Sequence, residues 1–447
     1  MQLSSRTIIA TLLLTSCTLM AQEVSRLSAL SFRLSGLGGM MMKDDKVDPW
    51  IDRPLAGAEF AVEFQPTGKW KCLQEWNNTS VGVGLTFLNL GNDKMLGNAI
   101  AIHGHLNTPF YRSRHFVIGL RPTVGLAICT KNYENTFPDG KDHLYEYVKK
   151  DGKAIANWSI GSYLNAYLGM EIFLDFPIKR GFDITAAFGW HHISNGSIQH
   201  PNSGYNMFLA SLGLRYQPGL DDEWLKAKDS RLPYERPEKQ RPKVLSEVEK
   251  KWDVEISASG GIKQNYYRDN HPHKQFWGAA TVKIAAHWIP VSIFKIGGGI
   301  DAFYDGYYAC VNEEFAAANP DASVTHFGKT YLTKSEVKNC FRVGFSLQPE
   351  FIIGNLTAGI HVGVYLWDPI KNLEYKKDIV EKRNGQPYDL GLFYAYDFSK
   401  ASNEKDGWCY MQFMLKYRVL KNMFVQLGLK THGVRAEFID AGLGVCF

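Results

Sequence analysis

The stretch Phe182–Tyr216, FDITAAFGWHHISNGSIQHPNSGYNMFLASLGLRY, contains two segments in which apolar residues alternate with small or polar ones. Side chains two residues apart on a β-strand point to the same face of the sheet. In the first segment that face is apolar from Phe182 to Trp190 and then carries His192 and Ser194. The pattern therefore predicts two successive strands, with an imidazole and a hydroxyl together at the end of the first.

The same alternation recurs along the whole chain and predicts about sixteen strands. The strands of the first half are expected near residues 27–38, 54–66, 79–90, 97–107, 114–129, 156–175, 181–194 and 204–217. About eight more are expected between residues 251 and 447. An apolar face opposite a small or polar face suits a strand whose outer side meets lipid, because lipid then replaces a protein core as the apolar neighbour.

The connections in the second half alternate between short and long. The links Ile289-Pro290, Gly354-Asn355 and Leu420–Asn422 are short, whereas Asp305–Cys340 and Trp367–Asp406 are long and polar. Outer-membrane barrels have short turns on the periplasmic side and long loops outside. The predicted fold class is therefore all-β, an antiparallel transmembrane β-barrel of about sixteen strands, as one barrel or as two eight-stranded units.

A soluble β-sandwich or propeller is the alternative fold, since it shares the alternation and the glycine-rich turns. Its dry core would have to hold side chains such as Arg33, Arg121, Glu171 and Arg215, whereas a barrel lumen can pair them with each other or with water. The terminal Phe447 also resembles the insertion signal of bacterial outer-membrane barrels. These features favour the membrane barrel.

The composition narrows the class of partner. The net charge of +5 is too small to indicate nucleic acid or an acidic substrate. After the N-terminus no apolar run is long enough for a transmembrane helix, which excludes a helical inner-membrane protein. Arg6 followed by the apolar run IIATLLL predicts a secretory signal peptide over residues 1–21, cleaved after Ala21. The alternative is a lipobox at Leu14–Cys17, with Cys17 lipidated; both imply export.

The domain organisation follows from the strand pattern. The predicted units are a first eight-strand unit at residues 22–217, a charged, proline-punctuated linker at residues 218–250 and a second eight-strand unit at residues 251–447. Apart from Cys17, six cysteines are scattered without CxxC spacing, so no zinc site is predicted. Cys310 and Cys340 bracket one expected loop and are the best candidates for a disulfide; six free thiols are the alternative.

Three polar side chains are expected to face lipid at one end of the first unit. Asn206 shares its face with Phe208 and Leu212, just as His192 and Ser194 share theirs with apolar residues. In a barrel whose N-terminus is periplasmic, the strand that ends at Ser194 runs outward, so these groups lie near the outer leaflet. Ser194 as nucleophile, His192 as base and a third group that orients the imidazole are the parts of an activated hydroxyl.

The motif HxSN at His192–Asn195, followed by PNxG at Pro201–Gly204, resembles that of the PagL-type lipid A deacylases. These are outer-membrane barrels that hydrolyse an ester-linked acyl chain from lipid A. The resemblance implies that His192 is the base, Ser194 the nucleophile, and Asn195, Gly196 and Asn202 the groups that hold the oxyanion or the substrate. It covers residues 22–217 and offers no motif for residues 251–447.

One position departs from the family. The PagL-type triad ends in a glutamate two residues after the PNxG glycine, and this chain has Asn206 there. An asparagine can orient a histidine but supplies no negative charge. The resemblance implies a bacterial outer-membrane serine esterase that acts on lipid A or lipopolysaccharide of the outer leaflet, with no cofactor, metal or nucleic acid. The alternative is a non-catalytic porin or transporter-like barrel.

Overall fold

The computed structural model describes residues 30–42, 47–64, 71–113, 115–136, 149–150, 153–154, 157–179, 181–217, 245–264, 276–306, 325–326, 329–331, 337–369, 373–376, 380–383, 386–389, 393–396, 408–433 and 435–447. The predicted signal peptide, most of the linker, and Cys310 of the predicted disulfide lie outside these residues. The proposed lipidation site at Cys17 lies outside them as well.

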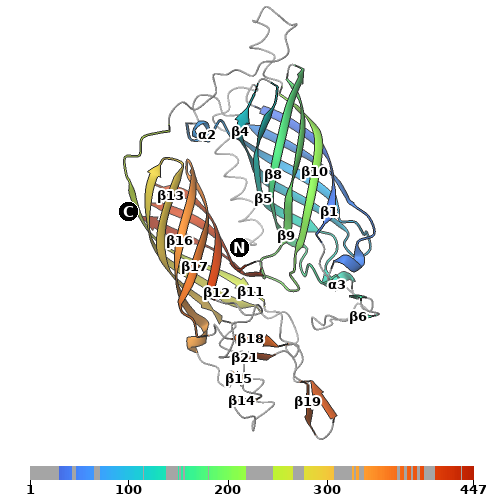
Figure 1. The fold of residues 1–447 in the computed structure, drawn as a ribbon, viewed down its shortest axis with the longest axis vertical. Helices are drawn as coiled ribbons and strands as arrows, with labels where there is room; N and C mark the ends of the chain where they lie inside the picture. The colour runs from blue at the N-terminus through green and yellow to red at the C-terminus, as the bar shows by residue number, and fades with distance from the viewer. Residues whose placement is uncertain are drawn as a thin grey trace, which may run out of the picture.

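The first half of the chain forms a closed antiparallel barrel (Figure 1). Its strands are β1 (Leu30–Met41), β2 (Leu55–Phe64), β3 (Ser80–Asn89), β4 (Asn98–Arg112), β5 (Val117–Cys129), β8 (Leu164–Lys179), β9 (Phe182–Ser194) and β10 (Tyr205–Tyr216). The barrel closes because β1 pairs with β10. The connections hold η2 (Asp48–Trp50), α2 (Lys71–Glu75), α3 (Tyr133–Thr136), β6 (Lys149–Lys150) and β7 (Lys153–Ala154).

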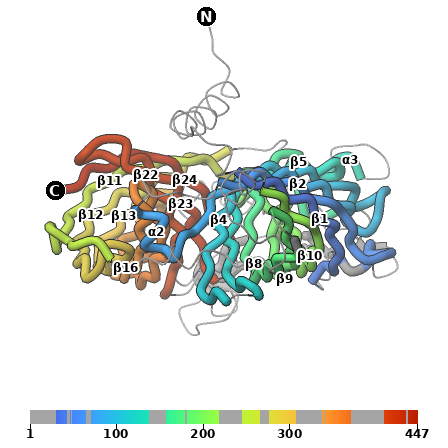
Figure 2. Tube along the Cα trace, turned by 90° about the horizontal axis from the view of Figure 1, so that it is seen from above, coloured from blue at the N-terminus to red at the C-terminus, as the bar shows by residue number. Residues whose placement is uncertain are grey.

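The second half forms another closed barrel, which lies beside the first (Figures 1 and 2). Its strands are β11 (Trp252–Lys263), β12 (Trp277–Val291), β13 (Phe294–Asp305), β16 (Phe341–Ile353), β17 (Leu356–Trp367), β22 (Cys409–Leu420), β23 (Met423–His432) and β24 (Arg435–Cys446). β11 pairs with β24, so the chain makes two eight-stranded barrels and not one of sixteen strands.

The long connections of the second barrel carry small elements of their own. They are β14 (Thr325–His326), β15 (Lys329–Tyr331), η5 (Val337–Cys340), β18 (Leu373–Lys376), β19 (Val380–Arg383), β20 (Gln386–Asp389) and β21 (Phe393–Tyr396). They all lie at one end of the barrel, whereas the opposite end has tight turns such as Gly354-Asn355. Among the described residues, no helix combines the length and the apolar character needed to cross a bilayer.

Both barrels are apolar outside, and most of the buried charged side chains lie inside. Large apolar side chains such as Leu34, Leu212 and Leu443 point outward and are 63%, 65% and 59% exposed. Lumen side chains such as Arg33 and Arg121 are each 1% exposed. This distribution is the reverse of that in a soluble sandwich and is the one that a lipid-facing barrel requires.

Ion pairs occupy part of the lumen of the first barrel, and a cluster of buried apolar side chains that includes Leu88, Ile193 and Met207 occupies another part. Arg33 binds Glu59 at 2.6 Å and Glu63 at 2.8 Å. Arg121 binds Glu171 at 3.2 Å, and Arg215 binds Asp175 at 2.8 Å. The prediction that these arginines point into the lumen is confirmed, and their pairing compensates the loss of hydration.

Three predicted boundaries are wrong. The fourth strand, β4, ends at Arg112 and not near residue 107. The sixth strand begins at Leu164 and not near residue 156, because residues 157–163 form turns beside the β9–β10 connection. Ile289-Pro290 is not a turn: β12 continues to Val291, and Ser292-Ile293 makes the turn. Pro290 has no N–H for the ladder, and the β12–β13 register shifts between Trp288 and Val291 to accommodate it.

The two barrels contact each other near both ends. At the end of the second barrel that has tight turns, the indole N–H of Trp76, in the β2–β3 connection of the first barrel, donates to the carbonyl of Ile352 at 2.8 Å, and its ring packs edge-on against Phe351. At the opposite ends, the loop between β9 and β10 contacts Gln264, which directly follows β11, and residues of β23 and β24. The β4–β5 and β8–β9 turns of the first barrel lie at the same end as the tight turns of the second, and the long loops lie at the other end. Both barrels therefore point in the same direction and can cross one bilayer.

Candidate active site

His192, Ser194 and Asn206 form a continuous chain of hydrogen bonds on the outer face of the first barrel. The Nε2 of His192 lies 2.8 Å from the Oγ of Ser194, and its Nδ1 lies 2.9 Å from the Oδ1 of Asn206. The three predicted side chains are therefore brought together. Their order, hydroxyl to imidazole to amide, matches the order of a nucleophile, a base and an orienting group.

Strand geometry explains this contact. His192 and Ser194 have the same parity on β9, and Asn206 lies directly opposite His192 in the β9–β10 ladder. Directly opposed side chains have their Cβ atoms about 4.5–5.5 Å apart, within reach of a hydrogen bond between an imidazole and an amide. The indole of Trp190 stacks on His192 with ring centroids 5.6 Å apart, which restricts the imidazole from the other side.

The hydrogen bonds fix how His192 can act. The amide oxygen of Asn206 is an acceptor, so it selects the imidazole tautomer that carries its proton on Nδ1. Nε2 then presents a lone pair to the hydroxyl of Ser194 and can take its proton. Ser194 is 8% exposed, so its hydroxyl is largely shielded from solvent.

The β9–β10 loop, residues 195–204, folds over this end of the barrel. The backbone N–H of Asn195 donates to the Oδ1 of Asn202 at 2.9 Å. The Asn195 amide donates to the Oγ of Ser162 and to the carbonyl of Gln199, each at 2.7 Å. Asn202 therefore lies next to the residue that follows Ser194, whereas the side chain of Asn195 is engaged in holding the loop.

Three residues of the β9–β10 loop have a left-handed backbone conformation. Gly196, Ser197 and Gly204 have φ angles of 60°, 69° and 76°. A Cβ on Gly204 would lie 2.6 Å from the Cε1 of His192. Glycine is therefore required at residue 204 both for its backbone conformation and to leave room for the imidazole.

The sequence pattern indicated some members of the site and missed others. It singled out His192, Ser194 and Asn206, and it placed Asn202 nearby. It missed Ser162, which lies in a segment predicted to be a strand and carries no motif. Ser162 supports the β9–β10 loop from a turn, and residues in turns have no periodic sequence pattern that would reveal such a contact.

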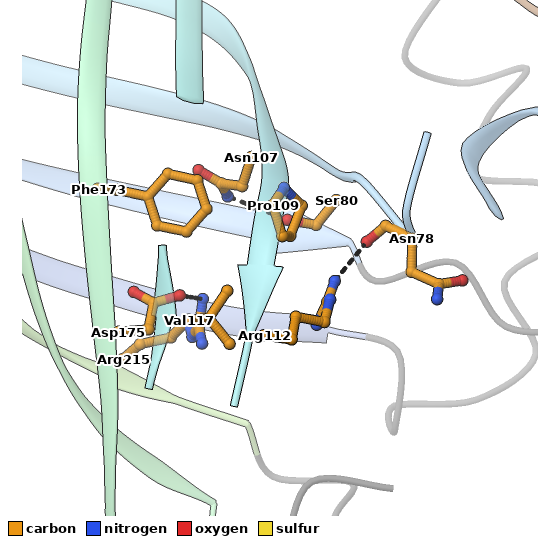
Figure 3. Close-up of a pocket in the computed structure, with 9 residues that line it drawn as sticks. All are labelled: Asn78, Ser80, Asn107, Pro109, Arg112, Val117, Phe173, Asp175 and Arg215. Carbon is orange, nitrogen blue, oxygen red and sulfur yellow. Dashed lines mark hydrogen bonds and ion pairs between the residues drawn. The ribbon is translucent and has the colours of Figure 1, made fainter. Parts of the chain in front are cut away.

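A pocket at the far end of the first barrel is a structural feature of the lumen (Figure 3). Asp175 and Arg215, which line it, pair at 2.8 Å, and Arg112 donates to the carbonyl of Asn78 at 3.1 Å. The pocket lies near the start of β3 and the end of β10, at the opposite end of the barrel from Ser194. It is separate from the candidate site.

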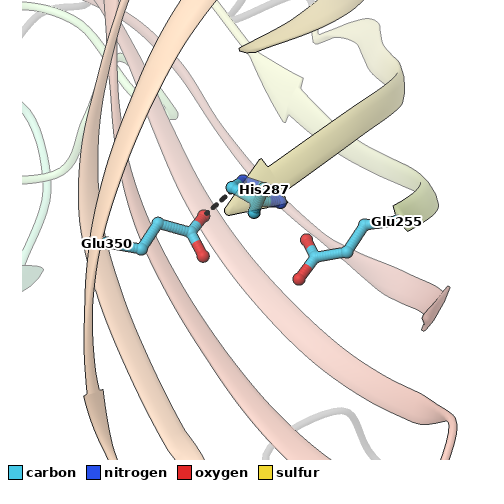
Figure 4. Close-up of side chains that lie close together, drawn as sticks. All are labelled: Glu255, His287 and Glu350. Carbon is cyan, nitrogen blue, oxygen red and sulfur yellow. Dashed lines mark ion pairs between the residues drawn. The ribbon is translucent and has the colours of Figure 1, made fainter. Parts of the chain in front are cut away.

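Glu255, His287 and Glu350 lie close together inside the second barrel and could present metal ligands (Figure 4). However, Lys416 reaches Glu255 at 2.6 Å and Glu350 at 2.5 Å, and Lys295 contacts both carboxylates too. Two ammonium groups already neutralise the two carboxylates, and their positive charge opposes a cation. The cluster is an ion-pair network that fills the lumen.

Comparison with protein families gives two matches that together span most of the chain. Residues 58–215 match the model described as lipid A 3-O-deacylase (PagL). Residues 252–379 and 388–447 match the model described as the C-terminal domain of acyloxyacyl hydrolase. No individual curated protein matches the chain.

Among solved structures, the outer-membrane enzyme PagL is 12% identical; the match covers 41% of this chain and 98% of that protein, with a TM-score of 0.26. Neisserial surface protein A is 10% identical over 42% and 96% of the two chains, with a TM-score of 0.27. The N-terminal barrel of Pseudomonas aeruginosa OprF is 12% identical over 42% and 97%, with a TM-score of 0.23.

Proposed function

The chain belongs to the PagL family of lipid A deacylases, and from this premise we propose that it is a serine esterase of the bacterial outer membrane. Its substrate is lipid A, from which it removes an ester-linked acyl chain. The observation that carries the proposal is the hydrogen-bonded chain from Ser194 through His192 to Asn206 on the lipid-facing side of a barrel.

The reaction uses the side chains in the order in which they are bonded. The Oγ of Ser194 attacks the ester carbonyl carbon, and Nε2 of His192 takes the hydroxyl proton. The tetrahedral intermediate collapses to an acyl-enzyme, and the imidazolium returns the proton to the departing alkoxide of the deacylated lipid. A water molecule, deprotonated by His192, then attacks the acyl-enzyme; the bond to the Oγ of Ser194 breaks, the imidazolium returns the proton to that oxygen, and the fatty acid leaves.

The β9–β10 loop supplies the groups that stabilise the oxyanion. The Oδ1 of Asn202 accepts from the backbone N–H of Asn195, so the amide NH2 of Asn202 is the donor end of that side chain. We assign this NH2 and the backbone N–H of Gly196 to the oxyanion. Preorganised donors of this kind each contribute about 3–4 kcal/mol to transition-state stabilisation.

The position of the site suits a membrane lipid. Below the polar residues, the outer face of β9 and β10 is apolar, and the rings of Phe188 and Phe208 stack with centroids 5.9 Å apart. An acyl chain can lie along this surface while its ester reaches Ser194. A passive pore is less well supported, because the buried ion pairs of Arg33, Arg121 and Arg215 occupy the lumen of the first barrel.

The test is the acyl pattern of lipid A. Mass spectrometry of lipid A from cells that produce the protein should show loss of one acyl chain, compared with cells that lack it. The Ser194→Ala variant should restore the original pattern. An unchanged pattern with the wild-type protein, together with single-channel currents in planar bilayers, would instead indicate a pore.

A further inference from the structure

We propose that the second barrel is a positioning element of the active site, and that Gln264 holds the β9–β10 loop in its working conformation. Gln264 directly follows β11 and is 2% exposed. The inference rests on the proposed esterase function. It assigns a role in catalysis to the half of the chain that carries no catalytic motif.

Gln264 contacts the β9–β10 loop at two separated points. Its backbone N–H donates to the carbonyl of Ser197 at 2.9 Å. Its side-chain Oε1 accepts from the backbone N–H of His200 at 3.0 Å. Ser197 lies three residues after Ser194, and His200 lies two residues before Asn202. Gln264 therefore fixes both arms of the turn that connects the nucleophile to the proposed oxyanion donor.

Other contacts from the second barrel support the same turn. The hydroxyl of Ser197 donates to the carbonyl of Ala436 at 2.8 Å. Gly196 packs so closely on Ile439 that a Cβ would lie 2.4 Å from that side chain, and 3.4 Å from Leu429. Leu429 and Ile439 are directly opposite each other on β23 and β24, with their side chains on the outer face of the barrel.

The backbone of the turn explains why it needs this support. Ser197 is a non-glycine residue with a φ of 69°. A left-handed conformation at such a residue persists only where surrounding contacts hold it. The contacts that hold Ser197 through its hydroxyl and carbonyl both come from the second barrel. The first barrel supplies the catalytic side chains, and the second fixes the loop that presents the oxyanion donors.

The test compares three variants of the full-length protein in detergent micelles, with hydrolysis of a chromogenic fatty-acid ester as the readout. Gln264→Ala removes the acceptor for the His200 N–H and is expected to lower kcat about tenfold, with KM changed less than about twofold. Gln264→Glu keeps an oxygen at that place and should recover most of kcat. Gln426→Ala, a matched control in the lumen of the second barrel, should leave kcat unchanged.

Folding is checked separately by the heat-dependent shift of the barrel in gel electrophoresis. A folded Gln264→Ala variant with wild-type kcat would overturn the inference, as would a loss that Gln264→Glu does not recover. A wild-type protein without esterase activity would instead overturn the proposed function.

A second pair of variants tests the apolar contact, and does so even if Gln264→Ala fails to fold. Gly196→Ala should lower kcat, because its new methyl group meets Ile439. Adding Ile439→Ala removes the obstructing atoms and should recover part of that loss, with the remainder due to the positive φ of residue 196. Strictly additive effects of the two substitutions would contradict contact between the second barrel and the loop.

Discussion

The amide oxygen of Asn206 lies 2.9 Å from the Nδ1 of His192, and the two residues are directly opposite each other on neighbouring strands. This contact can orient the imidazole, but it brings no negative charge to the imidazolium that forms when Ser194 is deprotonated. The chain therefore separates two roles that a carboxylate would combine. Asn206 can still orient the imidazole of His192, but it provides no charge that would stabilise the imidazolium.

Substitutions of Asn206 test separately the orientation of the imidazole and the stabilisation of the imidazolium. Asn206→Ala removes the orienting acceptor and is expected to lower kcat by roughly tenfold to a hundredfold. Asn206→Glu adds the missing charge and should raise kcat by about tenfold. Both are measured by ester hydrolysis at saturating substrate. If Asn206→Glu abolishes activity in a folded protein, the histidine is oriented in another way.

Adjacent histidines provide a matched comparison for the proposed base. His192→Ala should lower kcat by at least about a thousandfold, because the Nε2 of His192 is the basic nitrogen that lies within hydrogen-bond reach of the Ser194 hydroxyl among the described residues. His191 points into the lumen, where its Nδ1 lies 2.8 Å from the Tyr167 hydroxyl. His191→Ala should lower the unfolding temperature while kcat stays within about threefold of wild type. Equal losses of kcat in the two variants would argue against His192 as the base.

Substitution of Gly204 tests whether the imidazole of His192 needs the space that the missing side chain leaves. Gly204→Ala places a methyl group 2.6 Å from the Cε1 of His192 and should lower kcat by at least about tenfold through displacement of the ring. Gly38→Ala is the control, because a Cβ at residue 38 has no neighbour within 4 Å. Both variants should fold, as judged by electrophoretic mobility. A wild-type rate for folded Gly204→Ala would show that the imidazole tolerates movement.

Substitution of a buried arginine in the lumen is expected to lower the stability of the protein far more than substitution of an exposed arginine. Arg33→Ala removes the guanidinium that pairs with both buried carboxylates, Glu59 and Glu63, and should cost about 3–5 kcal/mol of unfolding free energy. The Arg53–Asp93 pair has side chains that are 52% and 60% exposed, so Arg53→Ala should leave the unfolding midpoint nearly unchanged. Urea unfolding in micelles, followed by tryptophan fluorescence, measures both. Similar midpoints for the two variants would contradict a stabilising role of the Arg33 pairs.

Much of the fold is encoded locally. Alternation with a period of two depends only on neighbouring residues, and it predicted the eight strands of the first barrel to within a few residues, apart from the start of β8 and the end of β4. The same period determines which way each side chain points. The shared outer face of His192, Ser194 and Asn206 could therefore be inferred before any coordinates.

The number of barrels depends on contacts that alternation does not encode. Each barrel closes through a pair of strands far apart in the chain, β1 with β10 and β11 with β24. A strand with one apolar face fits equally well in a barrel of eight or sixteen strands, because lipid covers that face in both. Only the pairing in three dimensions selects two barrels.

The sequence by itself determined the strands, their faces and the residues of the hydrogen-bonded chain at Ser194, because all of these follow from local periodicity and a short motif. Tertiary structure decided what supports them. Gln264, Leu429 and Ile439 reach the β9–β10 loop from the second barrel, and nothing in their local sequence distinguishes them from other strand residues. Contacts of this kind arise from the relative placement of two closed barrels, which no periodic pattern specifies.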